Sequence, residues 1–100
     1  MESEWELGSF DNSTGEKIPS TTQIRTKDRR IKPTNYSGAY RFISPDAGGR
    51  VYFYNADGTF NHYSSIAKKS GINLVAQKGA TYAVMLYTSD ISAGENSYLY

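Results

Sequence analysis

Apolar and polar residues alternate most regularly in the middle of the chain, over residues 50–63. Residues 51–54 are Val-Tyr-Phe-Tyr, so that apolar side chains alternate with phenols at the period of two of a β-strand. Residues 55–58, Asn-Ala-Asp-Gly, predict a turn, because Asn and Asp bond nearby backbone groups and Gly tolerates a positive φ. The pattern therefore predicts a β-hairpin with one face for a core and a second face that carries tyrosines.

Similar short segments, separated by turn-forming residues, occur on both sides of this hairpin. The strongest covers residues 80–88, in which Tyr82, Val84 and Leu86 share one face. Residues 65–71 fit either a single helical turn or a loop, and residues 89–97 are polar and loop-like. Seven or eight short strands at this spacing, with no convincing helix, predict an all-β sandwich or barrel. The other predicted strands cover residues 5–7, 20–27, 36–43, 59–63, 72–76 and 98–100.

The inward-facing positions of these strands define the expected core. Trp5 starts the fold, and we expect it to pack against the end of the sheet. The expected core consists of Leu7, Ile24, Phe42, Val51, Phe53, Phe60, Leu74, Tyr82, Val84 and Leu86.

The composition fits a single small β domain. One hundred residues predict one domain over residues 1–100, and nine tyrosines favour strands. The absence of cysteine excludes disulfides, thiolate metal sites and a cysteine nucleophile. The acidic N-terminus lacks the apolar region of a secretory signal, and no apolar run approaches the ~20 residues of a membrane span. We therefore expect no signal peptide, no transmembrane segment and no membrane partner.

The charges are distributed unevenly along the chain. The formal net charge is +1, but the first sixteen residues are acidic and residues 25–32 are basic. A basic run of this kind suits phosphate groups or an acidic polymer. The alternative is a solvated face offset by the acidic segment, which the low net charge favours. We therefore do not expect a nucleic-acid partner.

Catalytic and metal-binding chemistry is poorly represented. His62 is the single histidine and has no nucleophile motif beside it. A glycosidase needs two carboxylates that flank a bond, whereas Asp46, Asp57 and Asp90 lie in turn-like segments where Asp is common. Residues 55–58 resemble part of a calcium loop but lack its other acidic ligands. We predict no enzyme activity, no catalytic residue, no metal site and no cofactor.

Short motifs follow one another in an order that is informative. Residues 5–8 are Trp-Glu-Leu-Gly, residues 20–27 are Ser-Thr-Thr-Gln-Ile-Arg-Thr-Lys, and residues 31–33 are Ile-Lys-Pro, ahead of the central hairpin. This order resembles small jelly-roll, carbohydrate-binding-like modules in tail, baseplate and surface proteins of phages of Gram-positive bacteria. Residues 33–38 depart from the Pro-Gly-x-x-Tyr turn of that pattern. The resemblance implies a jelly-roll sandwich of two antiparallel sheets, with either glycan recognition at a cell surface or a structural role in a virion.

The tyrosines supply the main functional hypothesis. Sugars stack their C–H faces on aromatic rings, while polar side chains bond their hydroxyl groups. If the central hairpin and residues 80–88 share one sheet, alternate tyrosines form a solvent-facing platform. The alternative is that these tyrosines only satisfy strand propensity or belong to the core. The predicted ligand-binding residues are Tyr52, Tyr54 and Tyr87, rimmed by Arg41, Arg50, Asp46 and Asn61.

These observations together predict a non-catalytic carbohydrate-binding or host-surface-recognition module of a phage tail or bacterial surface protein. Its partner would be a polysaccharide, and its location a virion or an extracellular surface. The rival hypothesis is a structural or protein–protein interaction module, such as a virion subunit or a small phage effector. That module would dock other protein subunits through its tyrosine-rich or basic face.

Overall fold

The structure is a computed structural model that describes residues 3–28, 30–31, 39–70, 72–75 and 80–99; of residues 30–31, 39–41, 72–75 and 99 it describes the backbone. The chain is mostly β, as predicted, and the described residues contain one short helix. The strands are β1 (Trp5–Leu7), β2 (Ser9–Phe10), β3 (Lys17–Ile18), β4 (Ile24–Thr26), β5 (Arg30–Ile31), β6 (Ala39–Ile43), β7 (Gly49–Tyr54), β8 (Phe60–Ile66), β9 (Ile72–Val75), β10 (Thr81–Leu86) and β11 (Tyr98–Leu99), and the helix is α1 (Ile91–Glu95).

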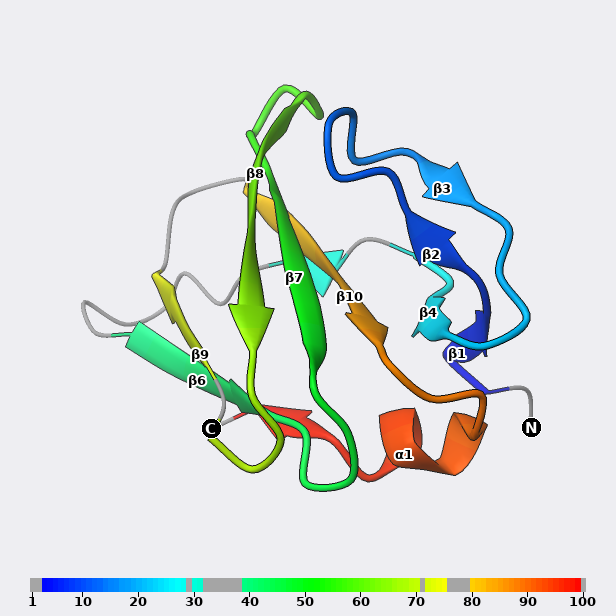
Figure 1. Cartoon of the computed structure of the whole chain (residues 1–100). Helices are drawn as coiled ribbons and strands as arrows, with labels where there is room; N and C mark the ends of the chain where they lie inside the picture. Colours follow the sequence, from blue (N-terminus) through cyan, green and yellow to red (C-terminus); the bar gives the residue numbers. More distant parts are fainter. Residues whose placement is uncertain (1–2, 29, 32–38, 71, 76–79, 100) are drawn as a thin grey trace.

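The strands form three antiparallel groups (Figure 1). The main sheet has the strand order β1-β4-β10-β7-β8, and β5 also pairs with β10. The second sheet has the order β11-β6-β9, and β2 and β3 form a separate two-stranded hairpin. Strands β7 and β10 are neighbours, so the central hairpin and residues 80–88 share one sheet, as the sequence hypothesis required.

The central hairpin is confirmed as the pair β7–β8. Its register runs from Gly49 opposite Ile66 to Tyr54 opposite Phe60, with one irregularity between Phe53 and Tyr54. The turn closes through a 2.8 Å hydrogen bond from the Asn55 N–H to the Thr59 carbonyl. Gly58 has a φ of 90°, the left-handed conformation for which glycine was expected there.

The inner face of the main sheet, defined by the alternating apolar residues, packs against the second sheet and α1. Phe42 of β6, Ala93 of α1 and Trp5 belong to this cluster, which confirms that Trp5 packs against the sheet. Apolar side chains from both sheets exclude water from this layer, which is the main stabilising contribution to the fold. Seven predicted core residues lie in it: Ile24, Phe42, Val51, Phe53, Tyr82, Val84 and Leu86.

Three predicted core positions have other outcomes. Leu7 is 49% exposed, because β1 is the edge strand of the main sheet and nothing described covers its last residue. Phe60 is partly buried, but it packs on the opposite face of the sheet, against the cluster of Tyr52 and Tyr54. The side chain of Leu74 lies outside the described residues.

Helix α1 lies where the sequence pattern predicted a loop, so that prediction is wrong. The Asp90 carboxylate accepts a 3.0 Å hydrogen bond from the Ser92 N–H, which caps the first turn. Gly94 lies against the indole, since a Cβ at this position would approach Trp5 Cδ2 to 2.2 Å. A polar capping motif and one close glycine contact therefore fix a helix too short to show an apolar period.

The described residues 65–70 form no helical turn, as in the loop alternative, and residue 71 lies outside the described residues. Ile66 ends β8, and residues 67–70 form a turn in which the Ser70 N–H donates to the Ala67 carbonyl at 3.1 Å.

Among the described residues, no helix has the length and apolar character needed to cross a bilayer.

The β2–β3 hairpin is fastened to the main sheet by Arg25 of β4. The Arg25 guanidinium donates to Glu6 Oε2 at 2.8 Å, to the Ser9 carbonyl at 3.0 Å and to the Ile18 carbonyl at 2.8 Å. Gly8 leaves room for this side chain, because a Cβ there would approach Arg25 Cζ to 2.5 Å. Arg25 is thus no part of a solvated basic face; Glu6 of the acidic N-terminal segment neutralises it.

Candidate functional site

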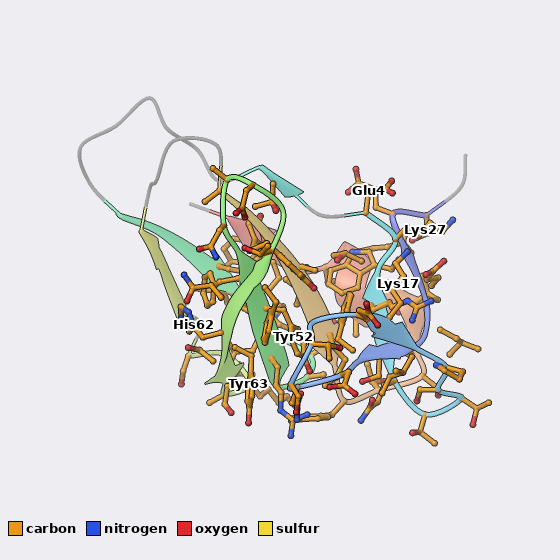
Figure 2. The ribbon with its side chains drawn as sticks, turned by 90° about the horizontal axis from the view of Figure 1, so that it is seen from above. Glu4, Lys17, Lys27, Tyr52, His62 and Tyr63 are labelled. Atoms are coloured by element: carbon orange, nitrogen blue, oxygen red, sulfur yellow. The ribbon has the colours of Figure 1, made fainter. Side chains whose placement is uncertain are left out.

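The outer face of the main sheet carries Tyr52 and Tyr54, opposite Val51 and Phe53, as the alternation predicted. The predicted solvent-facing platform of these rings is nevertheless wrong, since Tyr52 is 0% and Tyr54 is 1% exposed. The reason is the β2–β3 hairpin, which lies over this face (Figure 2). Strand pattern alone places the two phenols on one face but does not show that a second element covers them.

Each buried phenol has a hydrogen-bond partner in the covering hairpin. The Tyr52 hydroxyl donates to Asn12 Oδ1 at 2.7 Å, and the Tyr54 hydroxyl donates to the Gly15 carbonyl at 2.5 Å. The Phe10 ring of β2 lies 4.9 Å from the Tyr52 ring, between centroids. A phenol is buried at low cost only when its hydroxyl is satisfied, so these bonds position the hairpin over the sheet.

The remaining predicted site residues are only partly brought together. Tyr87 is 48% exposed and its ring centroid lies 5.5 Å from Arg50 Cζ, so these two residues share one surface. Asp46 lies in the turn before β7, where it accepts a 2.9 Å hydrogen bond from Asn96. Asn61 lies near the other end of the hairpin and donates to Asn55 at 2.9 Å. The side chain of Arg41 lies outside the described residues.

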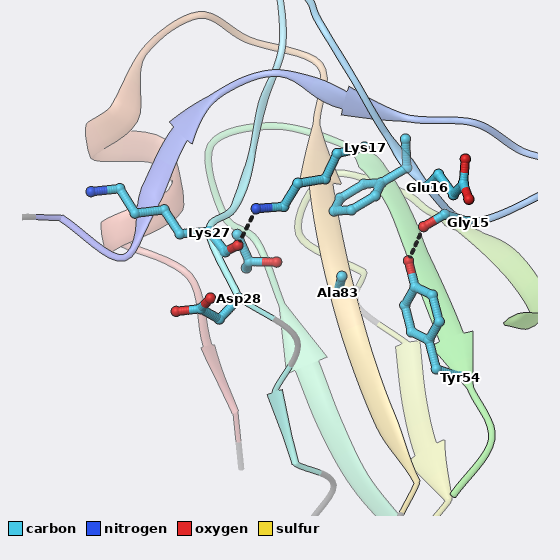
Figure 3. Close-up of a pocket in the computed structure, with 9 residues that line it drawn as sticks. Gly15, Glu16, Lys17, Lys27, Asp28, Tyr54 and Ala83 are labelled. Carbon is cyan, nitrogen blue, oxygen red and sulfur yellow. Dashed lines mark hydrogen bonds between the residues drawn. The ribbon is translucent and has the colours of Figure 1, made fainter. Parts of the chain in front are cut away.

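The β2–β3 hairpin and the outer face enclose a partly open pocket of about 330 Å³ (Figure 3). Ala83 forms its floor, with Tyr54 to one side and Lys27 and Asp28 to the other. We call it the hairpin pocket. Its lining residues come from β2, the β2–β3 turn, β3, β4 and the two residues after it, β7 and β10: Phe10, Gly15, Glu16, Lys17, Thr26, Lys27, Asp28, Tyr54 and Ala83.

The hairpin pocket combines an aromatic wall with a rim of both charges. The Phe10 and Tyr54 rings and the Ala83 methyl group supply apolar surface. The rim holds two cationic and two acidic side chains, so its formal charge is balanced. Lys17 is anchored, because its Nζ donates to the Lys27 carbonyl and lies 3.6 Å from Glu6 Oε2. Such a rim offers both donors and acceptors to a small ligand.

Glu6 links the pocket rim to the Arg25 clamp. The pKa of Glu6 lies below its ordinary value, chiefly because Arg25 donates a hydrogen bond to its carboxylate; burial opposes this shift, and the charges of Arg25 and Lys17 add to it. The carboxylate is therefore ionised at neutral pH, where it holds both cations in place.

Most pocket residues were not predicted from the sequence, in particular Phe10, Lys17 and Thr26. Strands β2 and β3 have two residues each, too few for an alternating pattern to appear. The available signal was the turn-rich segment 11–16, flanked by short runs that each contain one apolar residue. That signal identifies a turn, but it does not indicate which face the turn covers.

The described residues contain no group of three His, Asp or Glu side chains that could hold a metal ion. The His62 ring is stacked on Phe53, with centroids 4.6 Å apart, and its Nδ1 lies 2.9 Å from Asn61 Oδ1. Figure 2 shows His62 on the side of the molecule away from Lys17 and Lys27. His62 is therefore separated from the hairpin pocket.

No protein-family model matches the chain, and no curated protein or solved structure is significantly similar to it. The resemblance to phage jelly-roll modules accordingly stays a prediction from short motifs.

Proposed function

We propose that this chain is a non-catalytic polysaccharide-recognition module and that the hairpin pocket receives part of the polysaccharide. The observation that carries the proposal is the combination, in one pocket, of the Phe10 and Tyr54 rings with a charge-balanced polar rim. A polysaccharide thus remains the proposed partner. The predicted platform of tyrosine rings is replaced by a pocket at the same face of the sheet.

The chemistry of an uncharged sugar fits this combination. Its C–H faces are apolar and stack on aromatic rings, which supply a large contact area at low entropic cost. Its hydroxyl groups donate to carboxylates such as Asp28 and accept from ammonium groups such as Lys17. A volume of about 330 Å³ lies at the lower end of the range for ligand pockets, and therefore suits one unit of a chain rather than a long segment.

The proposal extends to architecture and location. We place the chain among jelly-roll-like sandwiches, in a phage tail or a bacterial surface protein, as the short-motif resemblance implies. The packing of the second sheet on the inner face, through Phe42, supports a two-layer arrangement. A position in a virion or at an extracellular surface belongs to the same proposal.

A glycan array followed by calorimetric titration tests the function. We expect weak binding to at least one wall or capsule polysaccharide, with little dependence on salt because the sugar itself is uncharged. Ala83→Leu, which fills the pocket floor, should weaken binding about tenfold or more. Glu16→Gln at the rim should weaken it less, whereas the matched change Glu95→Gln on α1 should have no effect.

The proposal is contradicted if no glycan binds. It is also contradicted if Ala83→Leu retains full affinity while its circular dichroism and thermal unfolding match the parent chain. Should Ala83→Leu fail to fold, the comparison of Glu16→Gln with Glu95→Gln decides, since both side chains are exposed.

A second candidate function, protein docking, is favoured by strand β8. It is seven residues long and contains no proline and no Asp, Glu, Lys or Arg. Among the described strands β8 pairs only with β7, so its outer edge presents backbone donors and acceptors that no described strand uses. Uncharged edges of this length readily pair with a strand of another chain.

Light scattering coupled to size exclusion tests this candidate. Docking through β8 to a second copy predicts a dimer that Ser65→Lys or His62→Pro on this strand disrupts. A monomer at all concentrations, whose edge amides exchange hydrogen freely, excludes self-association through β8.

A further inference from the structure

Two arginines on the outer face of the main sheet belong to one row of residues that are paired across neighbouring strands. Arg25 of β4 and Arg50 of β7 are both register partners of Met85, which lies between them on β10. The row continues to Glu6 on one side and to Ser65 on the other. The two side chains thus start from equivalent positions, and their different surroundings are informative.

The donors of Arg25 are used within the fold. Its guanidinium binds one carboxylate and two backbone carbonyls, and its side chain is 14% exposed. This residue is structural, because every contact named above joins the hairpin or β1 to β4.

The surroundings of Arg50 are different. Its Cζ lies 5.5 Å from the ring centroid of Tyr63 and 5.5 Å from that of Tyr87. These rings come from β8 and from the residue after β10, on either side of β7, and they are 40% and 48% exposed. No carboxylate of the described residues forms an ion pair with Arg50. Its neutral partners are Tyr52, with which it forms a hydrogen bond, and Asn12 Oδ1, which lies 3.5 Å away and also accepts from Tyr52.

We propose that Arg50, Tyr63 and Tyr87, here named the Arg50 surface, bind an oxyanion, a phosphate or carboxylate group carried by a ligand. Two ring contacts, each at 5.5 Å from Cζ, restrict the guanidinium, and its planar fork of N–H groups matches the paired oxygens of such a group. Pre-organisation lowers the entropic cost of a bidentate contact, which is why this arrangement favours an oxyanion over a neutral group.

Arg50 is cationic at neutral pH. Burial alone would lower the pKa of Arg50, but its hydrogen bond with Tyr52 and the surrounding phenols raise the pKa above its ordinary value. The Arg50 surface is also separate from the hairpin pocket, since none of its three residues lines that pocket. The inference therefore does not depend on the proposed sugar ligand.

The test follows the arginine side-chain Nε–H signals by NMR during titration with sodium phosphate and, separately, with sodium acetate at constant ionic strength. We expect the Arg50 signal to shift and to saturate, while the Arg25 signal stays unchanged as an internal control. Phosphate affinity should fall about tenfold in Arg50→Gln. Arg50→Lys keeps the charge but loses the planar pair of guanidinium donors, so it should retain part of the phosphate affinity. Lys68→Gln, an exposed cation elsewhere, should leave affinity unchanged.

The outcomes separate the two sources of oxyanion. Saturation by phosphate alone supports a phosphate-bearing ligand, and saturation by acetate as well supports a carboxylate. Absence of saturation by either anion overturns the inference, as does an equal effect of Lys68→Gln and Arg50→Gln. If Arg50→Gln proves unfolded, the parent chain decides, because an Arg50 signal that shifts no more than the Arg25 signal also overturns the inference.

Discussion

The two faces of the main sheet are built from the same strands but are closed in different ways. The inner face meets the second sheet and α1 through aliphatic and aromatic side chains, and Val51, Val84 and Leu86 are fully buried there. The outer face is covered by a hairpin of two short strands, and its largest buried residues are Tyr52 and Tyr54.

This difference shows which face of the sheet contains buried polar groups. The inner face needs only apolar contact, whereas the phenols of the outer face need hydrogen-bond acceptors, which Asn12 and Gly15 supply. The small cover leaves two features at its margins, the hairpin pocket and the Arg50 surface. The inner face therefore holds the fold together, and the outer face is where we expect ligands.

The largest expected effect comes from the inner face. Leu86→Ala removes a fully buried side chain and should destabilise the protein by about 2–5 kcal/mol. Urea unfolding followed by circular dichroism measures the change. Leu7→Ala, at a half-exposed position, is the matched control and should cost much less. Equal losses in the two variants would contradict the assignment of the inner face as the main core.

Loss of the Arg25 clamp should have the next largest effect. Arg25→Met removes the donor of two carbonyls and leaves Glu6 with Lys17 as its remaining cation, and we expect a loss of about 2–4 kcal/mol. Hydrogen exchange should show faster exchange of the Asp11 and Gly15 amides, which are bonded within the hairpin. Arg50→Met makes the same change at the equivalent position of the row and should cost less. A uniform acceleration throughout the main sheet would show that the hairpin does not open separately.

Removal of one phenol hydroxyl should have a smaller effect. Tyr54→Phe leaves the Gly15 carbonyl without its donor and should cost about 1 kcal/mol in urea unfolding. Tyr87→Phe, at a half-exposed ring, should be close to neutral. If the two variants are equally stable, the Tyr54 hydroxyl does not contribute to holding the hairpin.

The smallest expected effect is a pH dependence due to Glu6. Its folded-state pKa is lowered, chiefly by the hydrogen bond from Arg25. A group of this kind contributes stability above its unfolded pKa of about 4.3, and that contribution is lost as the pH falls through the folded pKa. The urea midpoint of the parent chain should therefore fall more steeply than that of Glu6→Gln below about pH 4.5. Parallel pH profiles would contradict the ion pair.

The strand pattern was sufficient for the all-β class, the β7–β8 hairpin and most of the inner core, because alternation reports which residues share a face. It also placed Tyr52 and Tyr54 together on the second face. It did not show the cover, since β2 and β3 are too short to alternate and their position depends on contacts of Arg25 and two phenols across the sequence.

The site was less predictable than the fold. Arg50 and Tyr87 were predicted as site residues and do share a surface, because Arg50 lies on β7 and Tyr87 directly follows the neighbouring strand β10. Asp46 and Asn61 were chosen for their polarity, and they bond to nearby loop residues instead. Tyr63 was not chosen, and counting back from the turn would have placed His62 opposite Tyr52, because the irregularity between Phe53 and Tyr54 shifts the register by one residue.

The central claim is that ligands bind the outer face at the margin of its hairpin cover. Amide chemical-shift mapping with a polysaccharide fragment selected by the array tests it most directly. The account predicts that the largest shifts occur at Gly15, Glu16, Lys17, Lys27 and Asp28. Largest shifts on α1 and the second sheet, with the hairpin amides unmoved, would contradict it.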